Sequence, residues 1–163
     1  MSIPKPNLDR IFKVLGKFEM LKELWIEKVN VEELPDSIEE LKHLNLLLIS
    51  ATYIKSISPK INNMENLQYF GIDDSYIESV PSELGNLKNL KVLSLECDTI
   101  KSLPQELRQL DSLESISLNG THLKEVPLFI KKLHEKQLKQ IGIYGNSHFP
   151  VECDISVLKD CKN

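Results

Sequence analysis

Apolar residues recur every 23 positions along most of the chain, and this period constrains the fold more than any other feature of the sequence. The clearest column of the repeat is Leu21, Leu44, Leu67, Leu90 and Leu113. Six apolar columns keep this period through five successive units, and the residue after the fourth column is proline in four of the five. Because one such unit cannot bury its own apolar face, the units are expected to stack and bury one another's.

Each unit combines a segment with strand spacing and a segment with helical spacing. In segment 90–95, Leu93 and Leu95 lie two positions apart, which puts both side chains on one face of a short strand. In segment 103–110 the apolar residues are spaced by four and three, and Pro104 stands near the first turn, where its missing N–H costs little. Parallel strands joined by right-handed crossovers would therefore wind the chain into a coil.

Residues 18–149 resemble the leucine-rich repeat family in its 23-residue form, which is found in intracellular Ras-suppressor-like scaffold proteins and in many bacterial proteins. Both the period and the spacing inside the unit match that family. The resemblance implies an α/β fold: a right-handed, curved solenoid (horseshoe) with a parallel sheet on the concave face and short helices or 3₁₀ turns on the convex face. It also implies a non-enzymatic module for protein–protein interaction.

We expect residues 1–163 to form a single leucine-rich repeat domain. Residues 1–17 are predicted to be an N-terminal helical cap, because Leu8, Ile11, Phe12 and Leu15 follow helical spacing after Asn7. About six repeats fill 18–149. The last repeat is degenerate, since Leu138 follows Leu133 by five positions where three would be regular. Residues 150–163 are expected to form a C-terminal cap.

The ninth position of each unit departs from the family, which usually has Asn there to bond backbone groups of neighbouring turns. This position holds Val29, Thr52, Ser75, Asp98 and Thr121, with Asn only at Asn146. Thr, Ser and Asp can partly replace those hydrogen bonds, whereas Val29 cannot. We therefore expect the fold to form without a continuous asparagine ladder.

No motif for catalysis or for cofactor or metal binding occurs in the sequence. A glycine-rich phosphate loop is absent, and Cys and His lack the spacing of a zinc site. We therefore predict no enzyme, no cofactor and no metal ligand. Cys97 has no matching histidine and is expected to be a small side chain at a strand exit. Cys153 and Cys161, which could pair, are interpreted as small apolar residues of the terminal cap.

Charge and hydropathy exclude further classes of function. The 20 basic and 24 acidic residues give a net charge of −4, which argues against nucleic-acid binding. No apolar run is long enough to cross a bilayer, and the N-terminus lacks the hydrophobic core of a signal peptide. We therefore expect a cytoplasmic protein that binds neither nucleic acid nor membranes.

Strand alternation predicts which residues face outward on the concave sheet. The fourth and sixth positions of a unit point into the coil, so the third, fifth and seventh face solvent. Stacking then gathers an apolar patch of Trp25, Leu46, Leu48, Tyr69 and Val92. Such patches usually mark contact sites, although the N-terminal cap or a second copy could cover this one. The predicted partner-binding residues are Trp25, Leu46, Leu48, Tyr69, Asp73, Val92, Ser94, Glu96 and Tyr144.

An acidic group lies beside this patch and has three interpretations. Asp73 and Glu96 are neighbours in the seventh column, with Asp74 and Asp98 close by. The group is a solvated rim, a contact for the basic groups of a partner, or part of a Ca²⁺ site.

The function predicted from these features is the binding of a protein segment across the concave sheet. Basic groups of that partner would meet Asp73 and Glu96. Two other classes stay open: a self-associating structural protein, and the targeting part of a bacterial effector or regulatory system whose catalytic part lies on another chain.

Overall fold

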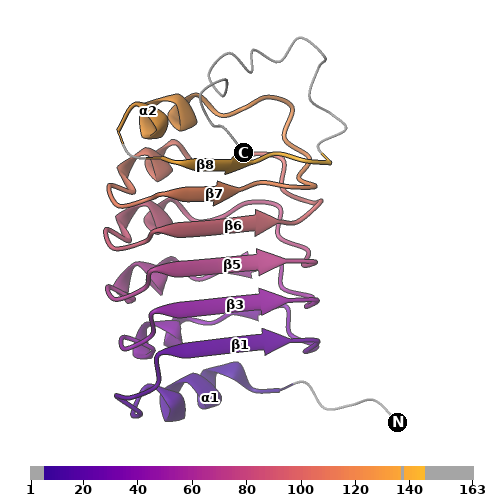
Figure 1. Cartoon of the computed structure of the whole chain (residues 1–163). Helices are drawn as coiled ribbons and strands as arrows, with labels where there is room; N and C mark the ends of the chain where they lie inside the picture. The colour runs from indigo at the N-terminus through magenta and orange to yellow at the C-terminus, as the bar shows by residue number, and fades with distance from the viewer. Residues whose placement is uncertain (1–5, 137, 146–163) are drawn as a thin grey trace.

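One parallel sheet runs the length of the molecule in the computed structural model, which describes residues 6–136 and 138–145 (Figure 1). Its strands, in the order β1-β3-β5-β6-β7-β8, are β1 (Glu23–Glu27), β3 (Leu46–Ser50), β5 (Tyr69–Asp73), β6 (Val92–Glu96), β7 (Ser115–Ser117) and β8 (Gln140–Gly142). Residues pair with those 23 positions on, so Leu46 pairs with Tyr69 and Tyr69 with Val92. Between β7 and β8 the interval is 25, as in the pair of Ser115 and Gln140.

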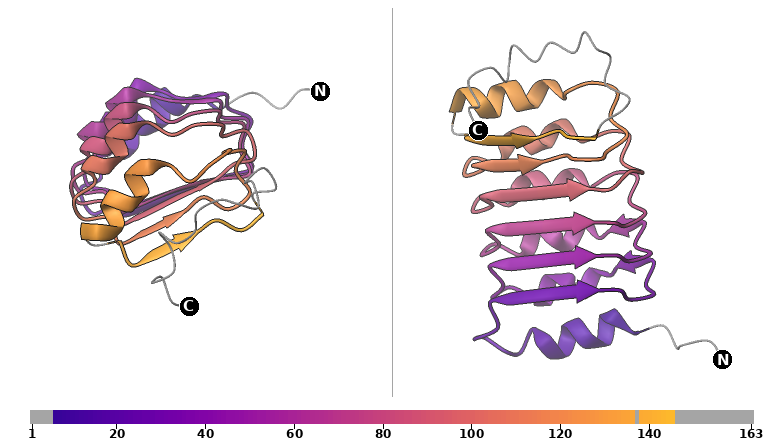
Figure 2. Two further views of the ribbon diagram at one scale, coloured as in Figure 1. Left: turned by 90° about the horizontal axis from the view of Figure 1, so that it is seen from above. Right: turned by 45° about the vertical axis from the view of Figure 1, so that its right-hand side comes forward.

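Short 3₁₀ helices line the side of the solenoid opposite the sheet (Figure 2). They are η1 (Asp36–Glu40), η2 (Pro59–Asn63), η3 (Ser82–Asn86) and η4 (Gln105–Gln109). Each follows an extended residue, which is proline before η1, η3 and η4, and the fixed φ of proline suits that position. The strands β2 (Glu33–Leu34) and β4 (Ser56–Ile57) form a second, two-stranded sheet that the sequence did not predict.

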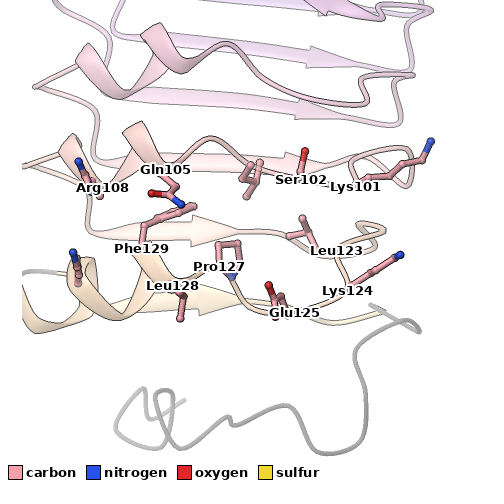
Figure 3. Close-up of a pocket in the computed structure, with 12 residues that line it drawn as sticks. Lys101, Ser102, Gln105, Arg108, Leu123, Lys124, Glu125, Pro127, Leu128 and Phe129 are labelled. Atoms are coloured by element: carbon pink, nitrogen blue, oxygen red, sulfur yellow. The ribbon is translucent and has the colours of Figure 1, made fainter.

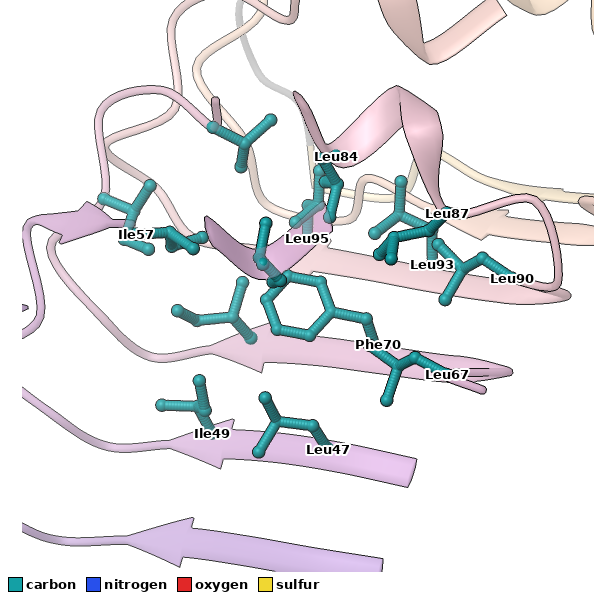
Figure 4. Packing of buried hydrophobic residues seen from close by; sticks show 14 of the residues in the cluster. Leu47, Ile49, Ile57, Leu67, Phe70, Leu84, Leu87, Leu90, Leu93 and Leu95 are labelled. Atoms are coloured by element: carbon teal, nitrogen blue, oxygen red, sulfur yellow. The ribbon is translucent and has the colours of Figure 1, made fainter. Parts of the chain in front are cut away.

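The apolar columns of the repeat fill the interior between sheet and helices (Figure 4). Leu47, Ile49, Phe70, Leu93 and Leu95 from three strands are fully buried. Complete burial of one such side chain stabilises the fold by about 1.5–3 kcal/mol relative to exposure. The predicted fold, a solenoid with a parallel sheet on one face and short helices on the other, is confirmed.

Helix α1 (Leu8–Leu15) covers the N-terminal end of the core. The side chain of Asn7 caps it by accepting a hydrogen bond from the Arg10 N–H at 2.9 Å. Phe12 is fully buried against the first repeat. After the helix, a Cβ at Gly16 would lie 2.5 Å from the Glu40 carbonyl oxygen, so only glycine allows this close approach to η1.

The ninth position holds a buried polar side chain in three repeats and an exposed one in the fourth. Thr52, Ser75 and Thr121 are buried, and the hydroxyls of Thr52 and Ser75 lie 2.8 Å apart. The expectation for Asp98 was wrong, because its side chain is exposed. Thr99 takes the role instead, and its hydroxyl donates to the Ile77 carbonyl at 2.6 Å.

Helix α2 (Leu128–Lys136) replaces the 3₁₀ helix in the fifth repeat. Two extra residues lie between Leu133 and Leu138, and they give this unit room for a nine-residue α-helix where the others have five-residue turns. Within 6–136 and 138–145, no helix has the length and apolar character to cross a membrane. The predicted C-terminal cap over 150–163, with Cys153 and Cys161, and Asn146 lie outside the described residues.

Candidate functional site

The outward face of the sheet is set by strand alternation. In β3, Leu47 and Ile49 are buried while Leu46, Leu48 and Ser50 remain partly exposed. Among the 18 outward positions of the six repeats, only Gly71 is buried. The predicted surface therefore exists as one continuous side of the sheet, and no predicted site residue is buried in the core.

Five of the predicted residues form the apolar patch, which we define as Trp25, Leu46, Leu48, Tyr69 and Val92. Trp25 pairs with Leu48 across β1 and β3, and Leu46 pairs with Tyr69 across β3 and β5. Trp25 is 60% exposed, and the other four side chains are partly exposed. The structure thus brings these residues together over four adjacent strands.

Gly71 shapes the centre of this patch and was missed from the sequence. A Cβ there would lie 2.7 Å from Leu48 Cδ1 and 2.9 Å from Tyr69 Cε1. The two side chains therefore lean over the glycine and occupy the space that a larger residue would need. The available signal was a glycine inside a strand between large apolar neighbours, which often marks a close approach.

Asp73 and Glu96 lie side by side in the register of β5 and β6. Glu96 Oε1 accepts hydrogen bonds from the Ser117 hydroxyl, from Asn119 Nδ2 at 3.2 Å and from the Ser94 hydroxyl at 3.3 Å. Ser117 and Asn119 were not predicted as site residues, although they occupy outward columns.

Asp73 has no such support. Its Oδ1 is buried and has no hydrogen-bond partner among the described residues. Burial, followed by the nearby charges of Asp73 and Glu96, raises the pKa of the Tyr69 phenol. The acidic pair and the apolar patch therefore meet at Tyr69.

The concave face as a whole is acidic. Its 18 outward positions hold the carboxylates of Glu23, Glu27, Asp73 and Glu96, and they hold no lysine or arginine.

Asp74 and Asp98 are exposed residues beyond the strand ends. Across the described part of the chain, no three His, Cys, Asp or Glu side chains gather closely enough to hold a metal ion. Cys97 beside them is 1% exposed, and burial raises the pKa of its thiol to about 11. The thiol is therefore protonated at neutral pH and unsuited to act as a nucleophile.

Tyr144 stands apart from the other predicted residues. It follows β8 at the opposite end of the sheet and is 76% exposed. Its N–H donates to Asn119 Oδ1 at 2.8 Å, so the repeat that contains Asn119 separates it from Glu96. The structure does not bring Tyr144 to the apolar patch.

Comparisons with known proteins agree with the fold of the chain. A family model described as a leucine-rich repeat region matches residues 7–99. The solved structure of the Leptospira interrogans LRR protein LIC12759 is similar, with 29% identity and a TM-score of 0.77, over 91% of this chain and 37% of that one. The leucine-rich repeat domain of the type III effector XCV3220 (XopL) has 17% identity and a TM-score of 0.73, over 85% of this chain and 57% of that one.

A plant receptor kinase is also similar. The Arabidopsis receptor kinase HAESA, solved in complex with the peptide hormone IDA and the co-receptor SERK1, has 26% identity and a TM-score of 0.66, over 83% of this chain and 24% of that one. The chain thus spans less than two thirds of each of these three structures. No curated protein matches it.

Proposed function

Because this chain belongs to the leucine-rich repeat family, we propose that it binds a protein segment across the concave face of its sheet. Apolar side chains of the segment pack on the apolar patch, with Trp25 and Tyr69 as aromatic anchors. A basic group of the segment meets Asp73 and Glu96.

The observation that carries this proposal is the register pair of Asp73 and Glu96 beside Tyr69, in which Asp73 Oδ1 is buried and has no hydrogen-bond partner among the described residues. Leaving a buried acceptor without a donor costs about 1–3 kcal/mol, and more when the group is charged. A lysine or arginine of the bound segment meets the partly exposed Asp73 side chain, and its charge offsets part of this cost. It also cancels the repulsion between Asp73 and Glu96, which face each other in register.

The solved relatives support this use of the fold. The receptor kinase HAESA was solved with a peptide hormone, and the part of it that matches this chain is 26% identical. The proposal takes from it only the class of ligand, a protein or peptide segment.

The test is affinity capture from a cell lysate with three forms of the full chain. The first is unaltered, and the second carries Trp25→Ala and Tyr69→Ala. The matched control carries Tyr53→Ala and Tyr76→Ala, which removes a stacked pair of exposed tyrosines, ring centroids 5.7 Å apart, outside the concave columns.

Proteins held by the unaltered chain and the control, but lost with the first pair of changes, are the expected result. Circular dichroism shows whether each variant stays folded. Equal recovery on all three forms would remove the concave face from consideration.

A second candidate is self-association through the N-terminal end. Ile11, Val14, Phe18 and Met20 are exposed there, and Met20 is 88% exposed. Such apolar surface favours contact with another protein or another copy. Sedimentation velocity over a concentration series separates the two candidates, because a strict monomer contradicts self-association.

A further inference from the structure

A groove of about 490 Å³ lies on the helical side of the solenoid, between η4 and α2 (Figure 3). It opens where the regular stack of 3₁₀ helices gives way to the longer α2. Leu123 and Phe129, which line it, are buried, and Leu103 is partly buried. Leu128 also lines the groove and is 86% exposed, so the wall includes an apolar side chain open to solvent.

Four cationic side chains line the groove, against one acidic side chain. They are Lys101, Arg108, Lys124 and Lys132, and the single carboxylate is that of Glu125. All four cations are exposed. The groove is therefore basic, although the chain as a whole carries a net charge of −4.

The ion pairs elsewhere on this side make the groove distinctive. Lys55 pairs with Glu32 at 3.4 Å, and Lys60 pairs with Glu39 at 3.6 Å. Lys101 pairs with Glu78 at 3.7 Å. Glu78 belongs to the repeat before Lys101, whereas the groove residue Lys124 belongs to the repeat after it. Within the described part of the chain, Arg108, Lys124 and Lys132 have no carboxylate in ion-pair distance.

We propose that this groove binds an acidic peptide segment that carries an apolar side chain. The apolar side chain packs against Leu128 and Phe129. Carboxylates of the peptide on either side of this apolar side chain pair with Arg108, Lys124 and Lys132. The guanidinium of the arginine and the ammonium groups of the two lysines are suitable hydrogen-bond donors to carboxylates. Charge complementarity selects this occupant, and the apolar wall favours a peptide over a nucleic acid, whose backbone would leave Leu128 uncovered.

This site differs from the concave face in the charge that it selects. The concave face holds four carboxylates and no basic residue at its outward positions, whereas the groove is cationic. One segment therefore does not suit both surfaces. The chain has the means to hold two different partners at once, one on each side of the solenoid.

The probe for this proposal is a short fluorescein-labelled synthetic peptide in which glutamates flank a Phe-Leu pair. A matched peptide has glutamine at each glutamate. Fluorescence anisotropy with the full chain measures both affinities. We expect saturable binding of the glutamate peptide, weakening as salt is added, and at least roughly ten-fold weaker binding of the glutamine peptide.

Two variants locate the binding. Arg108→Gln with Lys132→Gln neutralises two cations of the groove, and Lys55→Gln with Lys60→Gln neutralises two cations on the same side outside it. We expect the first variant to weaken binding roughly ten-fold and the second to leave it nearly unchanged. The variant Trp25→Ala with Tyr69→Ala leaves it unchanged, so this test is independent of the concave site.

The proposal would be overturned by a lack of saturable binding or by equal affinity of the two peptides. It would also be overturned if the groove variant and the Lys55 and Lys60 variant changed the affinity equally. A single-stranded oligonucleotide that binds more tightly than the glutamate peptide would also overturn it. The substituted lysine and arginine side chains are exposed, and those of Trp25 and Tyr69 lie on the outward face of the sheet. All variants are therefore expected to fold, and thermal unfolding followed by circular dichroism checks this.

Discussion

Asp73 and Glu96 face each other across β5 and β6, yet the hydrogen bonds from described residues reach the side chain of Glu96 and leave Asp73 Oδ1 without a partner. The two strands pair in register, so like charges meet one strand spacing apart, about 4.8 Å. Ser117 and Asn119 donate hydrogen bonds to Glu96, whereas Asp73 Oδ1 is buried without a donor among the described residues. The acidic pair is therefore less stable in the free chain than it would be with a cation from a partner.

Asp73→Asn should stabilise the free chain by about 0.5–1 kcal/mol, because it removes a like-charge pair across two strands. It should also weaken binding of a basic partner. Urea unfolding, with the midpoint as readout, measures the first effect. The control is Asp98→Asn, the same change of charge at an exposed site, which should stay within about 0.5 kcal/mol. A loss of stability in Asp73→Asn would mean that Oδ1 already has a donor.

The substitution of glycine by alanine should cost little stability at Gly71 and much more at Gly85. A Cβ at Gly71 meets Leu48 Cδ1 and Tyr69 Cε1, the ends of movable side chains, so Gly71→Ala should cost less than about 1 kcal/mol while it displaces the apolar patch. A Cβ at Gly85 would lie 2.2 Å from the backbone oxygen of Glu106. Gly85→Ala should therefore cost about 2–4 kcal/mol, because the backbone must move.

Thermal and urea unfolding of both variants, together with partner binding by Gly71→Ala, test this pair. Similar losses of stability in the two variants would contradict the argument. Unchanged partner binding by Gly71→Ala would show that the positions of Leu48 and Tyr69 do not matter.

The fixed period explains how much of the structure the sequence could predict. Once each strand residue pairs with the residue 23 positions further along the chain, Leu46, Tyr69 and Val92 must become neighbours. The members of the apolar patch can therefore be found from residue numbers alone. The same arithmetic failed at Asp98. The residues equivalent to Cys97 in three earlier repeats, Lys28, Ala51 and Asp74, have positive φ angles, whereas Cys97 does not. The residue types at equivalent positions do not show that the backbone of this one turn has a different conformation.

The groove on the helical side shows a different limit of sequence reasoning. The two extra residues before Leu138 predicted an irregular unit. Spacing alone does not say that they become part of an α-helix, or that this helix leaves a hollow beside η4. The charged side chains that line the hollow come from two successive repeats. The pattern within one repeat does not show that these side chains lie together.

Thr99→Val tests the assignment of Thr99 to the ladder position in the fourth repeat. The Thr99 hydroxyl donates to the Ile77 carbonyl at 2.6 Å and lies 3.5 Å from the Ser75 carbonyl. Valine keeps the shape and removes the donor, so the variant should lose about 1–2 kcal/mol of stability. Asp98→Asn, at the position that the sequence favoured, should change it by less than about 0.5 kcal/mol. A larger effect at Asp98 would restore the original assignment.

Cys97 should make stability depend on pH in the alkaline range. Burial raises the pKa of its thiol from the ordinary 9.0 to about 11, so the folded chain keeps a proton that the unfolded chain releases. The stabilisation is therefore fully present below pH 9 and is lost as pH rises to 11, by about 2–3 kcal/mol in total. Urea unfolding at a series of pH values from 8 to about 11 measures this slope.

Tyrosines and lysines also titrate in this range, so the informative quantity is the difference between the unaltered chain and Cys97→Ala. Alanine leaves a small cavity, which lowers stability by an amount that does not depend on pH. The curves of the two chains should therefore run parallel below pH 9 and converge above it, because only the unaltered chain pays to keep a buried thiol neutral. Parallel curves up to pH 11 would mean that the Cys97 thiol ionises as readily in the folded chain as in the unfolded one, contrary to its burial.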